Sequence, residues 1–423
     1  MLTRVLDPSY GADVRSRLGL LTLARTTANA VFRFAPPFLA TIAVGVGVSL
    51  ERIGVAMAIS ELGGLATPLT GMVVERLQRR TALWAGLVGL AGGALLAAAV
   101  PHLLVFALAL VVIGQGKAMF DLGLSAWISD RVPYERRGRV IGLTETAWAL
   151  GLLVGVTALG LITAAAGWRV AYVAGAVAAV ALAAALRRTL EPDPAPDPIP
   201  DPDPGWEPGG LRPDPGAIAP VIDHGPGRSA RGFDRRLPML AVGLFCLMAS
   251  AQTLFVTFGT WLKDSFGLSD SQLSAVVFGL GFFELVASLG AARFADRWGK
   301  ERAAAVGAAV MVPAVAALAV GHRVLVPGLV LLVVAIAAFE FAIVSAIPIG
   351  TELVAGAPAQ GVAIMFFVGT LGRAGAVVPA TSLYERHGMA WPAVVAAVLG
   401  CGAVAVMGWL GRPAADPAHP PLA

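Results

Sequence analysis

Charged residues are scarce in this chain. Asp, Glu, Lys and Arg make up 14% of its 423 residues, whereas hydrophobic residues make up 57%. Soluble domains carry about 25% charged residues, so this composition excludes a soluble globular protein and indicates one that spans a membrane. The formal net charge of +4 does not indicate a nucleic-acid partner, because the basic residues follow the expected membrane topology.

Cysteine and histidine are rare as well. Cys246 and Cys401 lie in apolar runs, and the histidines lie in loops, in the central segment or in the tail, without ligand-like spacing. Neither a disulfide framework nor a zinc site is supported. The stretch 114–117 (GQGK) lacks the leading glycine of a phosphate-binding loop, and no Ser-, Cys- or His-based nucleophile arrangement stands out. We therefore expect no metal, no cofactor and no enzymatic activity.

Long apolar runs dominate the rest of the sequence. A helix that crosses a bilayer needs about 20 mostly apolar residues, and the chain supplies about twelve such runs. They are rich in Ala, Leu and Gly without period-two alternation, which favours helices over strands. Pro36 and Pro37 should kink or unwind the first run, because each lacks a backbone donor. The runs lie near residues 18–43, 52–74, 81–101, 103–129, 140–165, 168–187, 238–262, 271–294, 303–321, 325–352, 361–383 and 389–411.

A segment of different composition separates the first six runs from the last six. Prolines alternate with acids from Glu191 to Pro198, and arginines cluster near its end. Alternating prolines cannot join a packed helix bundle, so we expect a cytoplasmic tether. Its acidic and basic blocks could alternatively bind each other or the anionic leaflet. The expected division is a first bundle at 1–190, a linker at 191–237, a second bundle at 238–412 and a tail at 413–423.

The distribution of basic residues sets the expected orientation. Most Lys and Arg fall in the amino terminus, the even-numbered loops, the linker and the tail. Short loops rich in Lys and Arg stay in the cytoplasm, so we expect a multi-pass protein of the cell membrane with both termini cytoplasmic. The alternate loops contain only Arg52, Arg169, Lys263, Arg323 and Arg386.

A short basic loop occurs twice, once in each half. It reads ERLQRR at 75–80 and DRWGKER at 296–302, and an internal repeat of this kind indicates a duplicated architecture. With six helices, a linker, six more helices and this loop after the second helix of each half, the chain resembles the major facilitator superfamily. The resemblance implies an all-α integral membrane protein, with twelve transmembrane helices in two pseudo-symmetric six-helix bundles.

The family's signature in this loop is Gly-x-x-x-Asp-Arg-x-Gly-Arg-Arg or a close variant. The first copy departs from it at Gln78, and the second has Ala292 in place of the leading glycine. The first copy matches at Gly71, Arg76, Arg79 and Arg80 and keeps an acid at Glu75. The second copy matches at Asp296, Arg297, Gly299 and Lys300.

The resemblance implies that these loops form a cytoplasmic gate. In the family such residues bridge to an acid at the cytoplasmic end of the fourth helix, where Asp130 is placed, and the loop alignment puts Glu352 at the corresponding place in the second half. Gly71 should let its helix pack tightly, and Glu75 can stabilise the amino end of the next helix. We expect two charge clusters that hold the outward-facing state. The alternative is solvated charges that only set topology.

Several charged residues fall inside the apolar runs. Each costs about 2.5–3.5 kcal/mol at mid-bilayer, so they must face the bundle interior or a water-filled cleft, except that Arg25 and Glu145 could snorkel to the surface. Lys117 and Asp121 are one helical turn apart and can neutralise each other. We expect Arg33 and Glu61 to form the second pair of the first half.

The interior of the apolar runs of the second half contains two carboxyl groups, Glu284 and Glu340, but only one basic residue, Arg373. Arg373 can compensate only one of Glu284 and Glu340, and desolvation of the other favours its protonated form. Such a group is a candidate proton site, and Glu340 is the first choice because the loop alignment sets it opposite Lys117. Glu340 could alternatively be a hydrogen-bonded structural acid. Glu284, Asp121 and Glu61 are the further proton-coupling candidates.

Aromatic and amide residues are expected to complete a central cavity. An apolar cleft with a few polar groups suits a drug-sized amphiphile, although most such residues in a helix bundle serve packing. The candidates are Asn29, Phe34, Gln252, Phe255, Phe258, Phe282, Phe339 and Phe366.

The leading hypothesis is a monomeric secondary transporter that exports a small amphiphilic compound in exchange for protons, with an ion gradient rather than ATP as its energy source. Exporters of the family carry Gly-x-x-x-Gly-Pro-x-x-Gly-Gly in the fifth helix. This chain matches at Gly151, Gly155 and Gly160 but departs at Val156 and Leu159, and the usual exporter arginine of the fourth helix is missing. An importer of a small metabolite is the alternative, and a membrane enzyme or receptor is a third.

Overall fold

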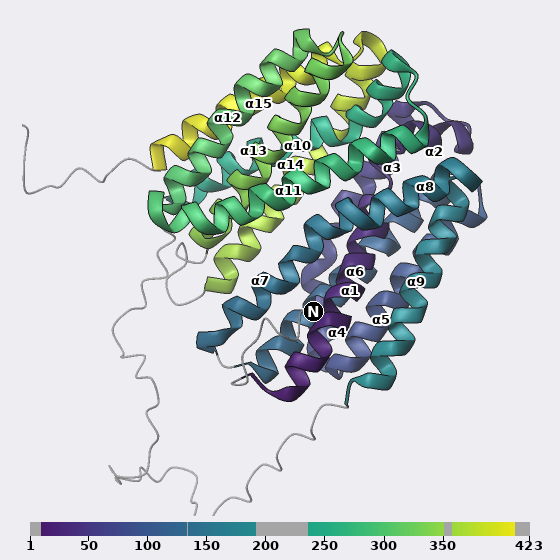
Figure 1. Ribbon diagram of the computed structural model, residues 1–423, viewed down its shortest axis with the longest axis vertical. Helices are drawn as coiled ribbons and strands as arrows, with labels where there is room; N and C mark the ends of the chain where they lie inside the picture. Colours follow the sequence, from purple (N-terminus) through teal and green to yellow (C-terminus); the bar gives the residue numbers. More distant parts are fainter. Residues whose placement is uncertain (1–9, 133, 192–235, 351–357, 411–423) are drawn as a thin grey trace, which may run out of the picture.

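The computed structural model describes residues 10–132, 134–191, 236–350 and 358–410, which form helices and short connections (Figure 1). Most of the expected linker and all of the expected tail lie outside these ranges, so the domain boundaries stay predictions. The first half contains α1 (Ala12–Arg33), α2 (Leu39–Val46), α3 (Leu50–Gly63), η2 (Gly64–Ala66), α4 (Thr67–Arg76), α5 (Arg79–Ala99), α6 (Leu103–Arg131), α7 (Tyr134–Leu150), η3 (Gly151–Val156), α8 (Thr157–Ala166) and α9 (Trp168–Thr189). The second half contains α10 (Arg236–Phe266), α11 (Asp270–Trp298), α12 (Lys300–Gly321), α13 (Leu325–Gly350), α14 (Pro358–His387) and α15 (Ala390–Leu410).

The membrane spans follow the apolar runs closely. Within the described residues, eleven helices are long and apolar enough to cross a membrane. The remaining expected span is the first one, which is divided into α1 and α2 at Pro36 and Pro37, as the missing backbone donors predict. The all-helical, two-bundle architecture expected from the sequence is therefore confirmed.

Two further spans are interrupted, and the sequence did not predict either break. The second span passes through the short 3-10 turn η2, where the Gln115 side chain donates to the backbone carbonyl of Gly63 at 2.6 Å and accepts from the Thr70 hydroxyl at 2.7 Å. The fifth span passes through η3, a π-helical segment. Interruptions of this kind often mark functional positions in helices, and both of these lie near the centre of their spans.

Small residues bring the third and fourth spans of each half together in the same way. A Cβ on Gly86 of α5 would collide with the backbone of Phe120 in α6, and a Cβ on Gly307 of α12 would collide with Ala342 in α13. Because lipid offers no hydrophobic driving force between helices, close backbone approach is what stabilises such pairs. The repeated contact is direct evidence that the two halves share one architecture.

The halves meet through symmetry-related spans. The second span of each half packs against the fifth span of the other, with α3 and η2 along α14, and α8 and η3 along α11. The approach is close: a Cβ on Gly281 of α11 would collide with the backbone of Leu153 in η3. These contacts gather toward the end of the molecule that holds Thr41, Lys263 and Asp270, which we call the Lys263 end. The opposite end holds the turn between α4 and α5, and we call it the Arg79 end.

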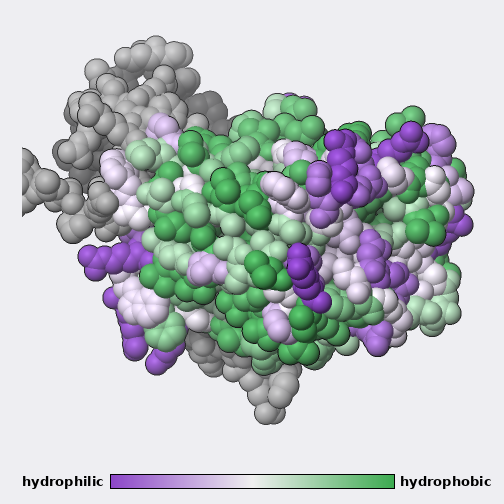
Figure 2. All heavy atoms as spheres, turned by 90° about the horizontal axis from the view of Figure 1, so that it is seen from above, coloured by the Kyte–Doolittle hydropathy of each residue, from purple (hydrophilic) through white to green (hydrophobic). Residues whose placement is uncertain are grey.

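The outer surface is apolar over much of its area. Hydrophobic side chains cover much of the face seen in Figure 2, and hydrophilic ones gather mainly toward its sides. Large apolar residues such as Leu104 in α6 and Val398 in α15 are 69% and 66% exposed. A monomeric soluble protein rarely exposes large contiguous apolar patches, so this surface fits contact with lipid.

Candidate functional site

Two ion pairs inside the spans connect the halves. Arg33 of α1 binds Glu284 of α11 in a bidentate manner, with Nη1–Oε2 and Nη2–Oε1 distances of 3.0 and 2.7 Å. Arg373 of α14 binds Glu61 of α3, with an Nη2–Oε2 distance of 3.0 Å. Each half therefore supplies one arginine and one glutamate to the other.

The expected Arg33–Glu61 pair within the first half is wrong. Glu61 lies on the part of the second span that packs against α14, so its nearest guanidinium is that of Arg373. Arg33 instead reaches Glu284 across the interface between the halves. The two residues were paired because they lie on consecutive spans. The order of the spans in the sequence does not show which helix faces meet across the interface.

Trp148 of α7 supports the Arg33–Glu284 pair. Its backbone carbonyl accepts a hydrogen bond from Arg33 Nη1 at 3.1 Å, and its ring centroid lies 4.5 Å from Arg33 Cζ. A buried charge pair is tolerated only when further hydrogen bonds satisfy its remaining groups, and a cation over an aromatic face gains additional attraction. Sequence reasoning missed Trp148, since one tryptophan in an apolar run looks like packing.

A second charge network lies within the first half. The expected Lys117–Asp121 pair of α6 is confirmed. Arg25 of α1 also binds Asp121, at 3.1 Å, and binds Glu145 of α7 at 2.8 Å. Lys117 Nζ lies 5.5 Å from the Trp148 ring centroid, so this network and the Arg33–Glu284 pair meet at one aromatic side chain. Arg25 and Glu145, which were expected only to reach the membrane surface, are thus members of this charge network.

Glu340 of α13 is the buried carboxyl without a cation. It is 4% exposed, accepts a hydrogen bond from the Ser288 hydroxyl at 2.6 Å, and forms no ion pair within the described part of the chain. Beside it on α13, Phe339 packs edge to face with Phe255 of α10, with ring centroids 6.3 Å apart. The sequence predicted one uncompensated carboxyl in the second half, and the geometry agrees, although Arg33 rather than Arg373 partners Glu284.

The remaining cavity candidates fall in different places. Asn29 is fully buried and donates to the Ala147 carbonyl at 2.9 Å, while its side-chain oxygen has no partner within the described structure. Gln252 is 6% exposed on α10. Phe282 is 48% exposed and stands two residues from Glu284, which places it on the other side of α11.

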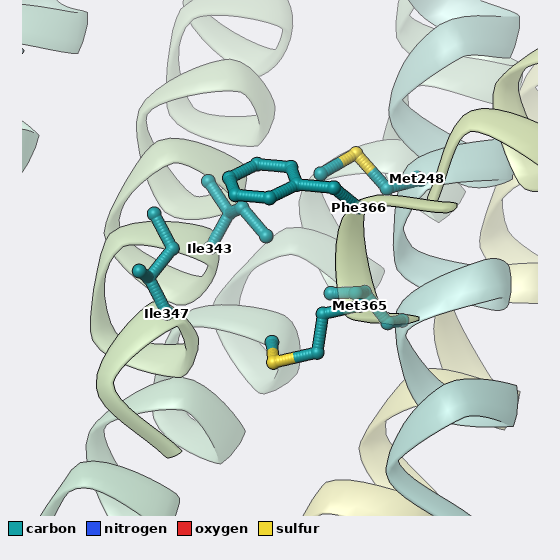
Figure 3. Close-up of a pocket in the computed structure, with 6 residues that line it drawn as sticks. Met248, Ile343, Ile347, Met365 and Phe366 are labelled. Atoms are coloured by element: carbon teal, nitrogen blue, oxygen red, sulfur yellow. The ribbon is translucent and has the colours of Figure 1, made fainter. Parts of the chain in front are cut away.

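Two aromatic candidates serve packing instead of lining open space. Phe34 is fully buried inside the first half, stacked on Phe38 and edge-on to Tyr172 at centroid distances of 5.1 and 5.0 Å. Phe258 is 1% exposed. The Phe34 ring fills the interior beside the break in the first span, where close packing requires bulk, and Phe258 contributes to the buried side of α10. Phe366, in contrast, is 54% exposed and lines a pocket in the second half (Figure 3).

Comparison with known proteins identifies the fold and the family. The sequence profile of the Major Facilitator Superfamily matches residues 21–377. The chain belongs to the major facilitator superfamily. Its sequence is also 30% identical over 105 residues to YwfA of Bacillus subtilis (strain 168), an uncharacterized transporter of MFS type, a match that spans 25% of this chain and 26% of that relative.

Solved structures of this superfamily share the fold over nearly the whole chain. A bacterial homolog of the human lysosomal transporter Spinster, in an inward-facing and unoccupied conformation, has a TM-score of 0.71 and 15% identity over 94% of this chain and 97% of its own. The human organic anion transporter MFSD10 has a TM-score of 0.64 and 18% identity over 94% and 100%. The nucleoside transporter NupG has a TM-score of 0.67 and 15% identity over 93% and 98%. Identities this low relate the folds alone.

The superfamily's signature loop in the first half forms one of the expected bridges. Arg79 Nε donates to Asp130 Oδ2 at 2.9 Å, and Arg80 donates to the Leu190 carbonyl at 3.4 Å. Glu75 and Arg76 are exposed in the last turn of α4. The first turn of α5 contains no acidic residue, so Glu75 lies before the helix end that it was expected to stabilise. Gly71 does not mediate tight packing, because a Cβ there would only reach ordinary contact with Leu122.

The second copy of the loop is described only in part. Gly299 has φ of 86° and opens α12, a conformation that favours glycine, whereas Gln78 opens α5 with φ of −58°. The departure from the signature at Gln78 is thus accommodated by a different turn. Arg297 is exposed, and Lys300 begins α12. The Asp296 side chain and Glu352 lie outside the described residues, so the second cluster stays a prediction.

At the Lys263 end a polar cluster joins the halves. Lys263 Nζ donates to the Thr41 hydroxyl at 2.6 Å and to Asp270 Oδ1 at 2.7 Å, and the Thr41 hydroxyl donates to the same carboxylate oxygen at 2.9 Å. Nearby, the Glu385 carboxylate of α14 accepts a hydrogen bond from the backbone N–H of Glu51 in the first turn of α3 at 3.0 Å. An anion at a helix amino terminus is stabilised by the helix dipole.

Proposed function

We propose that this member of the superfamily exports a small amphiphilic compound in exchange for protons, as a drug–proton antiporter does. The observation that carries the proposal is Glu340, which is buried on α13 and has no cation in the described structure. Its hydrogen-bond partner Ser288 lies one helical turn beyond Glu284 on α11, the residue that joins the halves by its pair with Arg33. A desolvated carboxyl without a cation takes up a proton readily, and perturbed carboxyls in clefts are functional candidates.

Alternating access supplies the mechanism. The halves contact each other mainly toward the Lys263 end, which the distribution of Lys and Arg assigns to the outside of the cell membrane. This arrangement corresponds to an inward-facing state with both termini in the cytoplasm. Rocking of the halves then separates the Lys263 end and the two ion pairs and closes the Arg79 end. The Arg79–Asp130 bridge is already formed in the present conformation and lies within the first half, so it does not distinguish the two states.

Protonation of Glu340 is proposed to couple this movement to the proton gradient. When Glu340 is neutral, Arg33 interacts with Glu284 alone, and this ion pair favours the conformation in which the halves are in contact at the Lys263 end. Ionised Glu340 adds a second negative charge beside one guanidinium, which weakens this preference. The protein is expected to work as a monomer.

The direct test is transport in inside-out vesicles under an imposed pH gradient, with cationic, anionic and neutral compounds. We expect accumulation that collapses when a protonophore is added. Glu340→Gln should abolish the proton-driven component while folding and substrate binding persist. Normal pH-driven accumulation by that variant would remove Glu340 from the mechanism.

An importer of a small metabolite is the second candidate. Val156, which stands where the exporter motif has proline, closes the π-helical segment η3. The fifth span thus differs from the exporter pattern at this point. Uptake only into right-side-out vesicles would favour the importer.

A further inference from the structure

Two outer helices of the first half meet at the Arg79 end. α5 begins there and α9 ends there, and the two pack along each other on the side that faces away from the second half (Figure 1). Val173, Val177 and Val180 form an exposed apolar face on α9, which fits contact with acyl chains. α9 has 22 residues and is about 33 Å long, close to a hydrocarbon core of about 30 Å. Its last turn therefore lies at the level of the lipid head groups.

Three arginines gather at this end of the helix pair. Arg187 and Arg188 are exposed in the last turn of α9. The Arg187 Cζ atom lies 4.9 Å from the ring centroid of Trp84 on α5. Arg80, one turn before Trp84, donates to the Leu190 carbonyl at 3.4 Å. These two contacts join the ends of the helices, so the three guanidinium groups form one basic cluster, which we call the Arg187 cluster.

The Arg187 cluster keeps hydrogen-bond donors free. Within the described part of the chain, no carboxylate forms an ion pair with its three arginines, and the exposed Glu191 that follows Leu190 is no exception. A guanidinium stacked on a ring uses its planar face, so the N–H groups at its edge stay available. Guanidinium N–H groups match the oxygens of a phosphate, often in bidentate pairs. A phosphate group is therefore the chemical complement of the cluster.

The corresponding helix pair of the second half lacks such a cluster. α12 and α15 pack together as α5 and α9 do. However, Glu301 lies in the first turn of α12, and the last turn of α15 contains no basic residue. Membrane topology requires only that Lys and Arg lie on the cytoplasmic side, which does not account for three arginines gathered around a tryptophan in one half alone. The cluster is thus a feature of this chain beyond what the repeated fold needs.

We propose that the Arg187 cluster binds one anionic phospholipid of the cytoplasmic leaflet. The lipid phosphate lies among the guanidinium groups of Arg80, Arg187 and Arg188, and an acyl chain runs along the exposed valines of α9. Trp84 lies at the head-group level, where tryptophan is enriched. The distribution of Lys and Arg assigns this end to the cytoplasm, whose leaflet carries anionic lipids. The site does not depend on the transport function proposed above.

The test is native mass spectrometry of the purified full-length protein in detergent micelles, titrated with phosphatidylglycerol or with phosphatidylcholine of the same acyl chains. We expect one phosphatidylglycerol to bind first and more tightly than phosphatidylcholine. A basic residue near the membrane surface contributes about fivefold to the affinity for an anionic lipid, which corresponds to about 1 kcal/mol. Arg80→Gln should weaken this first binding about fivefold, and Arg187→Gln with Arg188→Gln about 25-fold. Arg187→Lys with Arg188→Lys should retain most of it, because the charge remains.

Arg293→Gln with Arg302→Gln is the matched control, because it removes two exposed arginines near the same end of the second half. It should leave the first phosphatidylglycerol in place. The proposal is overturned if the wild-type protein binds both lipids alike or if the control weakens binding as much as the loss of Arg187 and Arg188. Displacement of the lipid by glycerol 3-phosphate would overturn it too, since the cluster would then be a site for soluble anions. So would binding that appears only after Asp193→Asn with Asp197→Asn, which would assign the arginines to the adjacent acidic segment.

Discussion

The Arg33–Glu284 pair makes a quantitative prediction about the balance between conformations. Both residues are less than a tenth exposed, so Glu284→Gln would leave the Arg33 guanidinium buried without a counter-charge. Removing one partner of a buried pair costs about 3–5 kcal/mol. The pair crosses the interface and is open to water once the halves part, so this cost falls on the present conformation alone.

The lower part of that range is the better estimate, since Arg33 keeps the carbonyl and the ring of Trp148. At about 1.4 kcal/mol per factor of ten, the equilibrium should shift by about a hundredfold toward the state in which the Lys263 end is open. Spin labels at Arg52 of α3 and Arg386 of α14, both exposed, would report this as a longer distance between the two labels.

Two further variants serve as a rescue and as a negative control. The exchange of charges in Arg33→Glu with Glu284→Arg should restore the shorter distance, because it rebuilds the pair with opposite polarity. Glu301→Gln, in the first turn of α12, changes a glutamate far from the interface and should have no effect. An unchanged distance in Glu284→Gln would show that the pair does not hold the halves together.

Three further predictions concern the interface and the signature loop. Gly281→Ala should open the Lys263 end or destabilise the fold, because the added Cβ collides with the backbone of Leu153. Gly279→Ala, two residues away with no atom within 4 Å of the added Cβ, should do neither. The spin-label distance and the thermal unfolding temperature would be measured for both variants. Asp270→Asn should open that end only slightly, since partly exposed pairs contribute about 0.2–1 kcal/mol; a shift as large as that of Glu284→Gln would contradict this ranking. Asp130→Arg should impair transport and Arg79→Asp should rescue it, and a failure of rescue would leave the charges a role in topology alone.

The parts of the fold that could be predicted are those that local sequence determines. Apolar runs of sufficient length give spans, Pro36 and Pro37 give the first break, and a four-residue spacing gives the Lys117–Asp121 pair. Each of these depends on residues within a few turns of one another. The doubled loop revealed the two halves because a repeat is visible in a single sequence.

The parts that could not be predicted depend on which faces meet. Glu61 and Arg373 are more than three hundred residues apart, and only the packing of α3 against α14 makes them partners. The π-helical segment at Gly151 was missed for a related reason. Its glycines resembled a family motif, and their common physical function, close approach to Asn29 and Ala30 of α1, appears only in three dimensions.

The reciprocal ion pairs suit an interface that must open and close. Attraction between buried charges roughly balances the cost of removing them from water, and well-packed apolar residues in their place are often more stabilising by about 1–4 kcal/mol. An apolar contact at Arg33 and Glu284 would therefore hold the halves in one conformation, whereas charges that regain water on parting make both conformations accessible. Since each half supplies one cation and one anion, parting leaves neither with excess charge from these pairs. Among the described residues, Glu340 is the buried carboxyl that remains outside this balance. In the proposed mechanism, its protonation is the change that biases an otherwise even equilibrium.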